Sequence, residues 1–116
     1  MYDIAIIGGG PAGLAAGLYG ARGGMDTVLL ENMLVGGQIT KTTQVDNFPG
    51  FPDGIDGFAI GTNMQKQAER FGLEIKRTGV DSVELKGEIK RLHCGREVIE
   101  AKAVIIATGA HPKKLG

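Results

Sequence analysis

Apolar runs on either side of a glycine-rich stretch predict strand, helix and strand over the first 31 residues. Tyr2–Ile7 is short, apolar and rich in β-branched residues, as expected of a strand buried on both faces of a parallel sheet. A helix should begin at Pro11, because proline is tolerated in the first helical turn, and should end near Gly23 and Gly24. Thr27–Glu31 is a second apolar run that predicts a strand. These segments together predict a βαβ unit.

The middle of the chain has a weaker pattern. Residues 32–54 contain glycines, asparagines and two prolines without a clear period, so we expect a long loop with one helical turn near Gln38–Thr43. A second helix is predicted over Ile55–Phe71, because four apolar residues recur at helical spacing: Ile60, Met64, Ala68 and Phe71. Leu73–Arg77 then predicts a third strand.

The last third of the chain changes to strand periodicity. Three segments alternate apolar and polar positions, Val80–Leu85, Ile89–Cys94 and Arg96–Ala103, and glycines lie between them, which is typical of an antiparallel meander. The apolar stretch Ala103–Thr108 follows as a further buried strand. We therefore predict an α/β fold, with a Rossmann-like parallel sheet that includes the βαβ unit and a three-stranded antiparallel meander.

Composition narrows the classes of partner. Thirteen basic side chains balance thirteen acidic ones in 116 residues, so no long-range field attracts nucleic acid or an anionic membrane. We expect no nucleic-acid or membrane partner, and a small molecule or a protein instead. The single cysteine excludes an internal disulfide framework and favours a cytoplasmic location. The N-terminal stretch lacks the basic region of a signal peptide, and no apolar run approaches the length of a membrane span.

The glycines carry the clearest chemical signal. Gly8, Gly10 and Gly13 match the G-x-G-x-x-G pattern, directly after a predicted strand and at the start of a predicted helix. Gly8 would permit a tight turn, Gly10 would let the backbone approach a pyrophosphate, and Gly13 would let helix and strand pack closely. The helix opens with Pro11 and Ala12, and its free N–H groups would face the phosphates.

Glu31 adds a second component to this pattern. It lies eighteen residues after Gly13, at the end of the second predicted strand, where a carboxylate can accept hydrogen bonds from a ribose 2′-hydroxyl. A carboxylate would repel a 2′-phosphate, so the pattern favours FAD or NAD over NADP. The residues themselves do not choose between FAD and NAD.

Three separated motifs together carry a resemblance to a known family. The stretch IIGGGPAGLAAGLYGARGG, the later GGQITKTTQVDNFPGFPDGIDG and the final VIIATGAHPKKLG closely resemble the N-terminal FAD-binding segment of low-molecular-weight thioredoxin reductases. The resemblance covers essentially residues 1–116 and implies the first part of an incomplete FAD/NAD(P)-binding domain. The nucleotide domain and the C-terminal part of the FAD domain would then be absent from the chain, and the turn after Gly109 would lead toward the nucleotide domain. That absent C-terminal part would supply a strand beside Ala103–Thr108.

The resemblance also implies cofactor contacts that spacing alone does not give. They would come from the GGQ loop, from the asparagine of the VDNFPG stretch, from the backbone at the start of the meander and from the end of the last strand: Gly36, Gly37, Gln38, Asn47, Val80, Thr108 and Gly109. Asp46 replaces the glutamate usual before that asparagine, a mild departure from the family pattern.

The activity that the resemblance implies belongs to a longer parent protein. Electrons would pass from a reduced donor, NADPH or ferredoxin, through FAD to a C-x-x-C disulfide and then to a thioredoxin-like protein, and the parent would be a homodimer. This chain has only Cys94, so we expect no catalytic residue in it and no activity of its own. We also expect no metal site, because His93 and Cys94 are adjacent on a predicted strand and should point to opposite faces. A ferredoxin–NADP reductase-like flavoprotein and a non-catalytic FAD- or NAD-binding module remain the alternatives.

Overall fold

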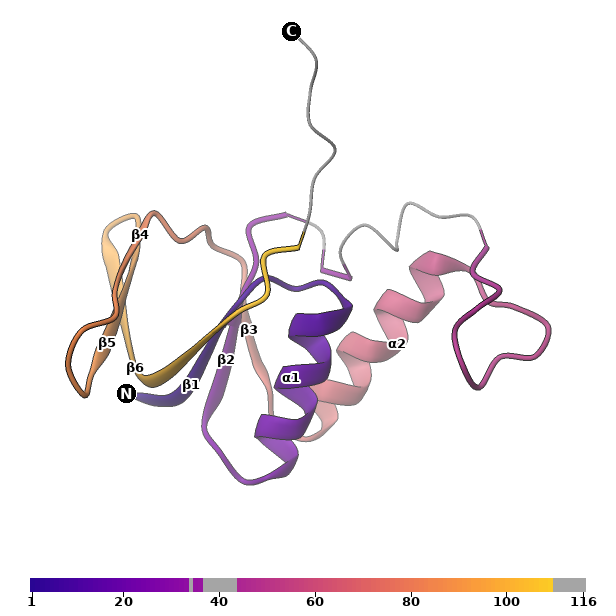
Figure 1. The fold of residues 1–116 in the computed structure, drawn as a ribbon, viewed down its shortest axis with the longest axis horizontal. Coiled ribbons are helices and arrows are strands. Elements are labelled where there is room, and N and C mark those ends of the chain that lie inside the picture. The colour runs from indigo at the N-terminus through magenta and orange to yellow at the C-terminus, as the bar shows by residue number, and fades with distance from the viewer. Residues whose placement is uncertain (34, 37–43, 110–116) are drawn as a thin grey trace, which may run out of the picture.

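The computed structural model describes residues 1–33, 35–36 and 44–109 of the chain. The elements of this part (Figure 1) are β1 (Tyr2–Ile7), α1 (Pro11–Arg22), β2 (Thr27–Leu30), α2 (Gly57–Arg70), β3 (Glu74–Lys76), β4 (Ser82–Glu84), β5 (Lys90–Cys94) and β6 (Glu97–Ile106). Neither helix is long and apolar enough to cross a membrane, a finding limited to these described residues. The helical turn predicted near Gln38–Thr43 lies outside the described residues.

One mixed sheet organises the molecule, with strand order β3-β2-β1-β6-β5-β4. The first four strands of this order are parallel, and β6, β5 and β4 pair antiparallel. Central strand β1 pairs on both sides, since Ile4 lies opposite Thr27 of β2 and opposite Ala103 of β6. The predicted α/β fold with a parallel sheet and an antiparallel meander is confirmed.

The last two predicted strands are a single strand, which corrects the sequence prediction. Ala101 pairs with Lys90 of β5 on one side and with Tyr2 of β1 on the other. The meander strand therefore runs into the parallel strand without a break. The physical reason is that Glu97–Ile106 contains no glycine, proline or other turn residue, so nothing interrupts the extended backbone.

Each face of the sheet has its own apolar core. On one face, α1 and α2 pack side by side (Figure 1) over a cluster of buried residues: Ile6, Leu14, Ala21, Leu29, Val35, Ala68 and Leu73. The predicted apolar face of α2 is confirmed, because Ile60 and Ala68 are buried and Met64 and Phe71 pack against the core. On the other face, the curled meander covers the parallel strands through Ala5, Val28, Leu30, Leu92, Cys94, Ile99 and Ala101. Strand β2 is thereby buried along its whole length, whereas Ala12 and Thr108 at the carboxyl edge of the sheet are exposed.

Local signals set the ends of the helices. The side chain of Asp56 accepts a hydrogen bond from Phe58 N at 2.7 Å and caps α2, which is why that helix begins two residues after the predicted start. By contrast, α1 begins at Pro11 without any side-chain cap. Within the part of the chain that the structure describes, no side chain therefore caps the N–H groups at the N-terminus of α1.

Candidate dinucleotide-binding site

The carboxyl ends of the parallel strands meet at one edge of the sheet, beside the N-terminus of α1 (Figure 1). Backbone hydrogen bonds extend the ladders past the strand ends. Gly8 N donates to Leu30 O at 3.0 Å, and Ala107 N donates to Ile7 O at 2.8 Å. The turn after β1 and the segment after β6 are thus held against each other, where ligands bind on open parallel sheets.

Gly8 and Gly13 occupy positions that leave no room for a side chain. Gly8 has a φ of +112°, and a Cβ atom there would lie 2.1 Å from Ala107 O. A Cβ atom on Gly13 would lie 1.9 Å from Gly8 O, so α1 packs directly on the turn. The tight turn and the close packing predicted for these two glycines are both present.

The start of α1 is arranged to receive an anion. Gly10 is the N-cap residue, with φ −77° and ψ −172°, and its carbonyl accepts from Leu14 N at 2.9 Å. Pro11 has no N–H, which leaves the amides of Ala12 and Gly13 as first-turn donors ahead of that bond. These donors and the helix dipole favour negative charge at this position.

Glu31 follows β2 and lies beside the glycine-rich turn. Its Oε1 accepts from Gly9 N at 2.8 Å, and its Oε2 accepts from Met33 N at 2.9 Å. Each carboxylate oxygen has a second lone pair, so the side chain retains two acceptor positions. The fold therefore brings together the two parts of the predicted motif, which are eighteen residues apart in sequence.

Gly9 is a residue that the sequence analysis missed. It occupies a variable position of the G-x-G-x-x-G pattern, so the motif gives no signal for it. Its amide binds Glu31, and its carbonyl accepts from Gly36 N at 2.6 Å. The predicted GGQ loop therefore starts in contact with the turn. Gly37 and Gln38 lie outside the described residues.

The end of the last strand also reaches this edge. Thr108 lies beside the turn, because its Cα would be 3.1 Å from a Cβ atom on Gly8. Gly109 is exposed and has a φ of +77°, a left-handed conformation that favours glycine. Thr108 thus lies next to the glycine-rich turn, and the contacts of both residues with a cofactor stay a prediction.

The other two predicted contact residues are placed differently. Asn47 is exposed, in a loop closed by the bridge between Val45 and Ile55, and this loop lies beyond the N-terminus of α2 (Figure 1). Val80 is partly buried and packs against the core on the meander side of the sheet. Gly79, just before Val80, lies close to Asn32, since an added Cβ there would be 3.2 Å from Asn32 Nδ2. The cofactor contacts of Asn47 and Val80 stay predictions.

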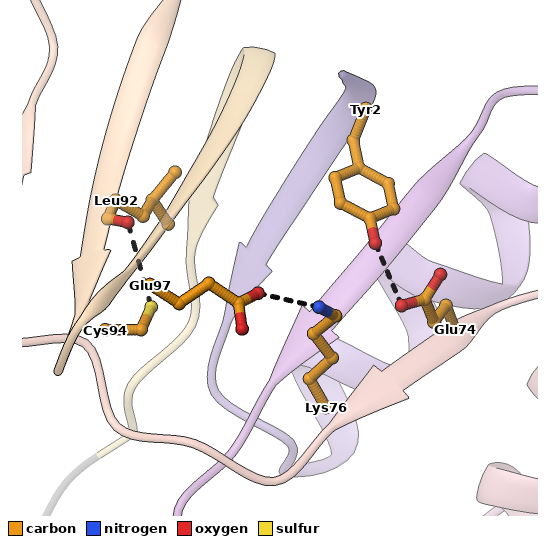
Figure 2. Close-up of polar contacts among 6 residues, drawn as sticks. All are labelled: Tyr2, Glu74, Lys76, Leu92, Cys94 and Glu97. Atoms are coloured by element: carbon orange, nitrogen blue, oxygen red, sulfur yellow. Dashed lines mark hydrogen bonds and ion pairs between the residues drawn. The ribbon is translucent and has the colours of Figure 1, made fainter.

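Polar contacts hold the curled meander over the parallel strands (Figure 2). Lys76 Nζ of β3 lies 2.7 Å from Glu97 Oε1 of β6, although two strands separate β3 from β6 in the sheet. The hydrogen bond to Glu97 raises the pKa of Lys76. Tyr2 Oη donates to Glu74 Oε2 at 2.8 Å, and burial, followed by this contact, raises the pKa of Tyr2. The Lys76–Glu97 pair ties the meander to β3, whereas the Tyr2–Glu74 bond joins β1 to β3.

The lone cysteine is a core residue. Cys94 is buried, its Sγ lies 3.8 Å from Leu92 O, and burial raises the pKa of the thiol, which disfavours the nucleophilic thiolate. His93 points to the other side, where its Nε2 lies 2.6 Å from Glu84 Oε2. This alternation agrees with the predicted opposite orientation. Among the described residues no group of three or more His, Cys, Asp or Glu side chains is placed to hold a metal ion.

Comparison with known proteins gives matches over the whole chain. The family model for pyridine nucleotide-disulphide oxidoreductases matches residues 2–116. The chain is 50% identical to a thioredoxin reductase of Peptoclostridium litorale over 116 residues, which are all of this chain and 37% of the relative. The resemblance that the three motifs predicted is confirmed.

Solved structures agree with this relationship. The crystal structure of thioredoxin reductase from Streptococcus pyogenes superposes with a TM-score of 0.94 at 40% identity, covering 100% of this chain and 38% of that one. A ferredoxin-flavin thioredoxin reductase from Clostridium acetobutylicum gives a TM-score of 0.87 at 30% identity, covering 98% of this chain and 39% of that one. The chain thus spans less than half the length of the proteins it matches.

Proposed function

Because the chain belongs to the pyridine nucleotide-disulphide oxidoreductase family, we propose that it is the FAD-binding part of a thioredoxin reductase-like flavoenzyme. The observation that carries the proposal is the accessible carboxyl edge, where the glycine-rich turn, the uncapped start of α1 and Glu31 lie together. In this proposal residues 1–116 form the N-terminal part of an FAD-binding domain in a longer, cytoplasmic, homodimeric parent protein.

The residues at the edge fit a dinucleotide in a specific orientation. Gly10 and the amides of Ala12 and Gly13 would receive the pyrophosphate, because they combine free donors with the positive end of the α1 dipole. Glu31 would accept from the adenosine ribose through the lone pairs that Gly9 and Met33 leave open. A ligand with a 2′-phosphate would meet the negative charge of Glu31 and bind poorly.

Further contacts to FAD are proposed for the residues that the family resemblance implies. Gly36 and Thr108 are supported by their position beside the glycine-rich turn, and Gly109 follows Thr108 directly in the sequence. For Gly37, Gln38, Asn47 and Val80 the support is the resemblance of their motifs to the thioredoxin reductases.

The bound flavin would supply the redox chemistry, and the chain would supply binding and orientation. One cysteine cannot form an intrachain disulfide, so the reducible disulfide would be a C-x-x-C pair elsewhere in the parent. A thioredoxin-like protein would be the final acceptor. The donor would be NADPH or reduced ferredoxin, and one of the similar structures is described as a ferredoxin-flavin thioredoxin reductase.

A titration with FAD tests the binding proposal. Gly10→Val would place a branched side chain at the phosphate turn, and the negative φ of −77° at this residue is accessible to valine. We expect the variant to keep the wild-type far-UV circular dichroism spectrum and to lose FAD binding, measured by flavin fluorescence. Gly10→Ala should give an intermediate affinity. Equal affinity of wild type and Gly10→Val would show that this turn does not bind the phosphates.

The remaining alternatives are separated by activity. A ferredoxin–NADP reductase-like parent would transfer electrons between ferredoxin and NADP without reducing thioredoxin, and a pure binding module would do neither. Assays of the parent protein with thioredoxin and with either NADPH or reduced ferredoxin separate these cases. We expect no turnover by the 116-residue chain alone.

A further inference from the structure

We infer that Glu31 has a role in the unliganded protein, as a positioning residue that holds the glycine-rich turn in its binding conformation through Gly9. This inference rests on the proposed dinucleotide function and extends it. Glu31 would then have two roles, of which accepting hydrogen bonds from the ribose is one. The other role, holding the turn through Gly9, needs no ligand.

The contacts of Glu31 connect three segments of the chain. One carboxylate oxygen accepts from Gly9 N at 2.8 Å in the turn after β1, and the other accepts from Met33 N at 2.9 Å in the loop after β2. Its own backbone N donates to Lys76 O at 3.1 Å at the end of β3. A charged acceptor between two backbone donors forms stronger hydrogen bonds than a neutral one.

Both backbone polar groups of Gly9 are hydrogen-bonded. Its N–H is bound by Glu31, and its C=O accepts from Gly36 N at 2.6 Å. Its Cα also lies close to the stem of Glu31, since an added Cβ would be 3.0 Å from Glu31 Cβ and 3.2 Å from Leu29 Cδ2. The peptide that precedes Gly10 therefore has little freedom to rotate.

This arrangement leaves the ribose position free. Two donors use one lone pair on each oxygen, and two lone pairs remain for hydroxyl groups. Glu31 can therefore keep its hold on Gly9 while it accepts a ribose. Removal of the carboxylate charge should therefore weaken the hydrogen bond to the ribose and also loosen the glycine-rich turn that would bind the phosphates. A pre-organised turn binds more tightly because less ordering remains to be done on binding.

A ligand without ribose hydroxyls separates the two roles. The probe is 2′,3′-dideoxyadenosine diphosphate, which keeps the adenine and the pyrophosphate but has no hydroxyl for Glu31 to accept from. We expect Glu31→Gln to bind this probe about threefold to tenfold more weakly than wild type, the effect of about one lost hydrogen bond. The matched control is Glu88→Gln, an exposed glutamate in the turn between β4 and β5, which should bind like wild type. Equal affinity of Glu31→Gln and wild type for the probe would overturn the positioning role.

Amide exchange in the unliganded chain tests the same role without any ligand. Alanine offers no acceptor, so Glu31→Ala should speed hydrogen exchange at Gly9 and Met33 by about tenfold, and at Gly36 to a smaller extent. Glutamine keeps one acceptor oxygen, so Glu31→Gln should speed exchange at one of these two amides only. Unchanged exchange at Gly9 in a folded Glu31→Ala chain would also overturn the inference. If wild type binds neither FAD nor the probe, the proposed dinucleotide function fails, and the exchange rates alone then decide whether Glu31 holds the turn. Circular dichroism of Glu31→Gln and Glu31→Ala identifies the variant that stays folded for these measurements.

Discussion

Two alanine substitutions in α1 test how closely the helix packs on the glycine-rich turn. Gly13→Ala and Gly17→Ala change two buried glycines of the same helix in the same way, and both gain up to about 1 kcal/mol of helix propensity. They differ in what the new methyl group meets. At Gly13 it meets the backbone oxygen of Gly8 at 1.9 Å, whereas at Gly17 it meets the end of the Leu73 side chain at 2.7 Å.

The loss of stability in each variant depends on how easily the atoms that meet the new methyl group can move away. Ordinary contact begins at 3.4 Å, so the helix and the turn at Gly13 must separate by about 1.5 Å. Gly8 N donates a hydrogen bond to Leu30 O, and Ala107 O leaves no space beside the Gly8 Cα. The turn therefore cannot move away from α1 without losing these contacts. We expect Gly13→Ala to lower the free energy of unfolding by about 2 to 3 kcal/mol. Gly17→Ala should stay within about 1 kcal/mol of wild type, because the terminal methyl groups of Leu73 can rotate away.

Urea unfolding followed by far-UV circular dichroism measures both values. A gap of about 2 kcal/mol between the variants corresponds to melting temperatures about 10 °C apart for a chain of this size. If Gly13→Ala is as stable as Gly17→Ala, the close approach of α1 to the turn does not exist in solution and the proposed phosphate site loses its geometry.

Two further predictions concern the sheet edge and acid stability. Beyond Ala101, β6 pairs with β1 but not with β5, and Ile106 is 62% exposed. We therefore expect the 116-residue chain to self-associate through this edge, and Ile106→Lys to shift it toward monomer in size-exclusion chromatography. A wild-type chain that stays monomeric at high concentration would contradict this prediction. The backbone N–H of Asp26 donates to the Asp3 carboxylate and lowers the pKa of Asp3 in the folded state. The ionised carboxylate therefore stabilises the fold above the unfolded pKa of about 3.9, and this stabilisation is lost as the pH falls through the folded pKa. Asp3→Asn should therefore have a lower free energy of unfolding than wild type near neutral pH, and should lose less of it between about pH 5 and pH 2. Urea unfolding at each pH measures both values, and parallel pH profiles of the two proteins would refute this prediction.

The local elements of this fold were readable from the sequence. Tyr2–Ile7 forms a strand with the predicted bounds, and α1 begins at Pro11, because apolar runs and a proline in the first turn act over a few neighbouring residues. The association of Glu31 with the glycine-rich turn was also predictable. A strand, a helix and a parallel strand bring both carboxyl ends to the same edge of the sheet whatever the other residues are.

Other features depended on residues that are distant in sequence. The hydrophobic pattern divides Glu97–Ile106 into a meander strand and a parallel strand, but one extended backbone serves both because β5 and β1 lie on its two sides. The importance of Gly9 appears only when Glu31 and Gly36 come together around it. Its position in the motif tolerates any residue as far as the pattern shows. Pattern and spacing report on neighbours along the chain, whereas a strand with two partners and a peptide held from both sides are set by packing in three dimensions.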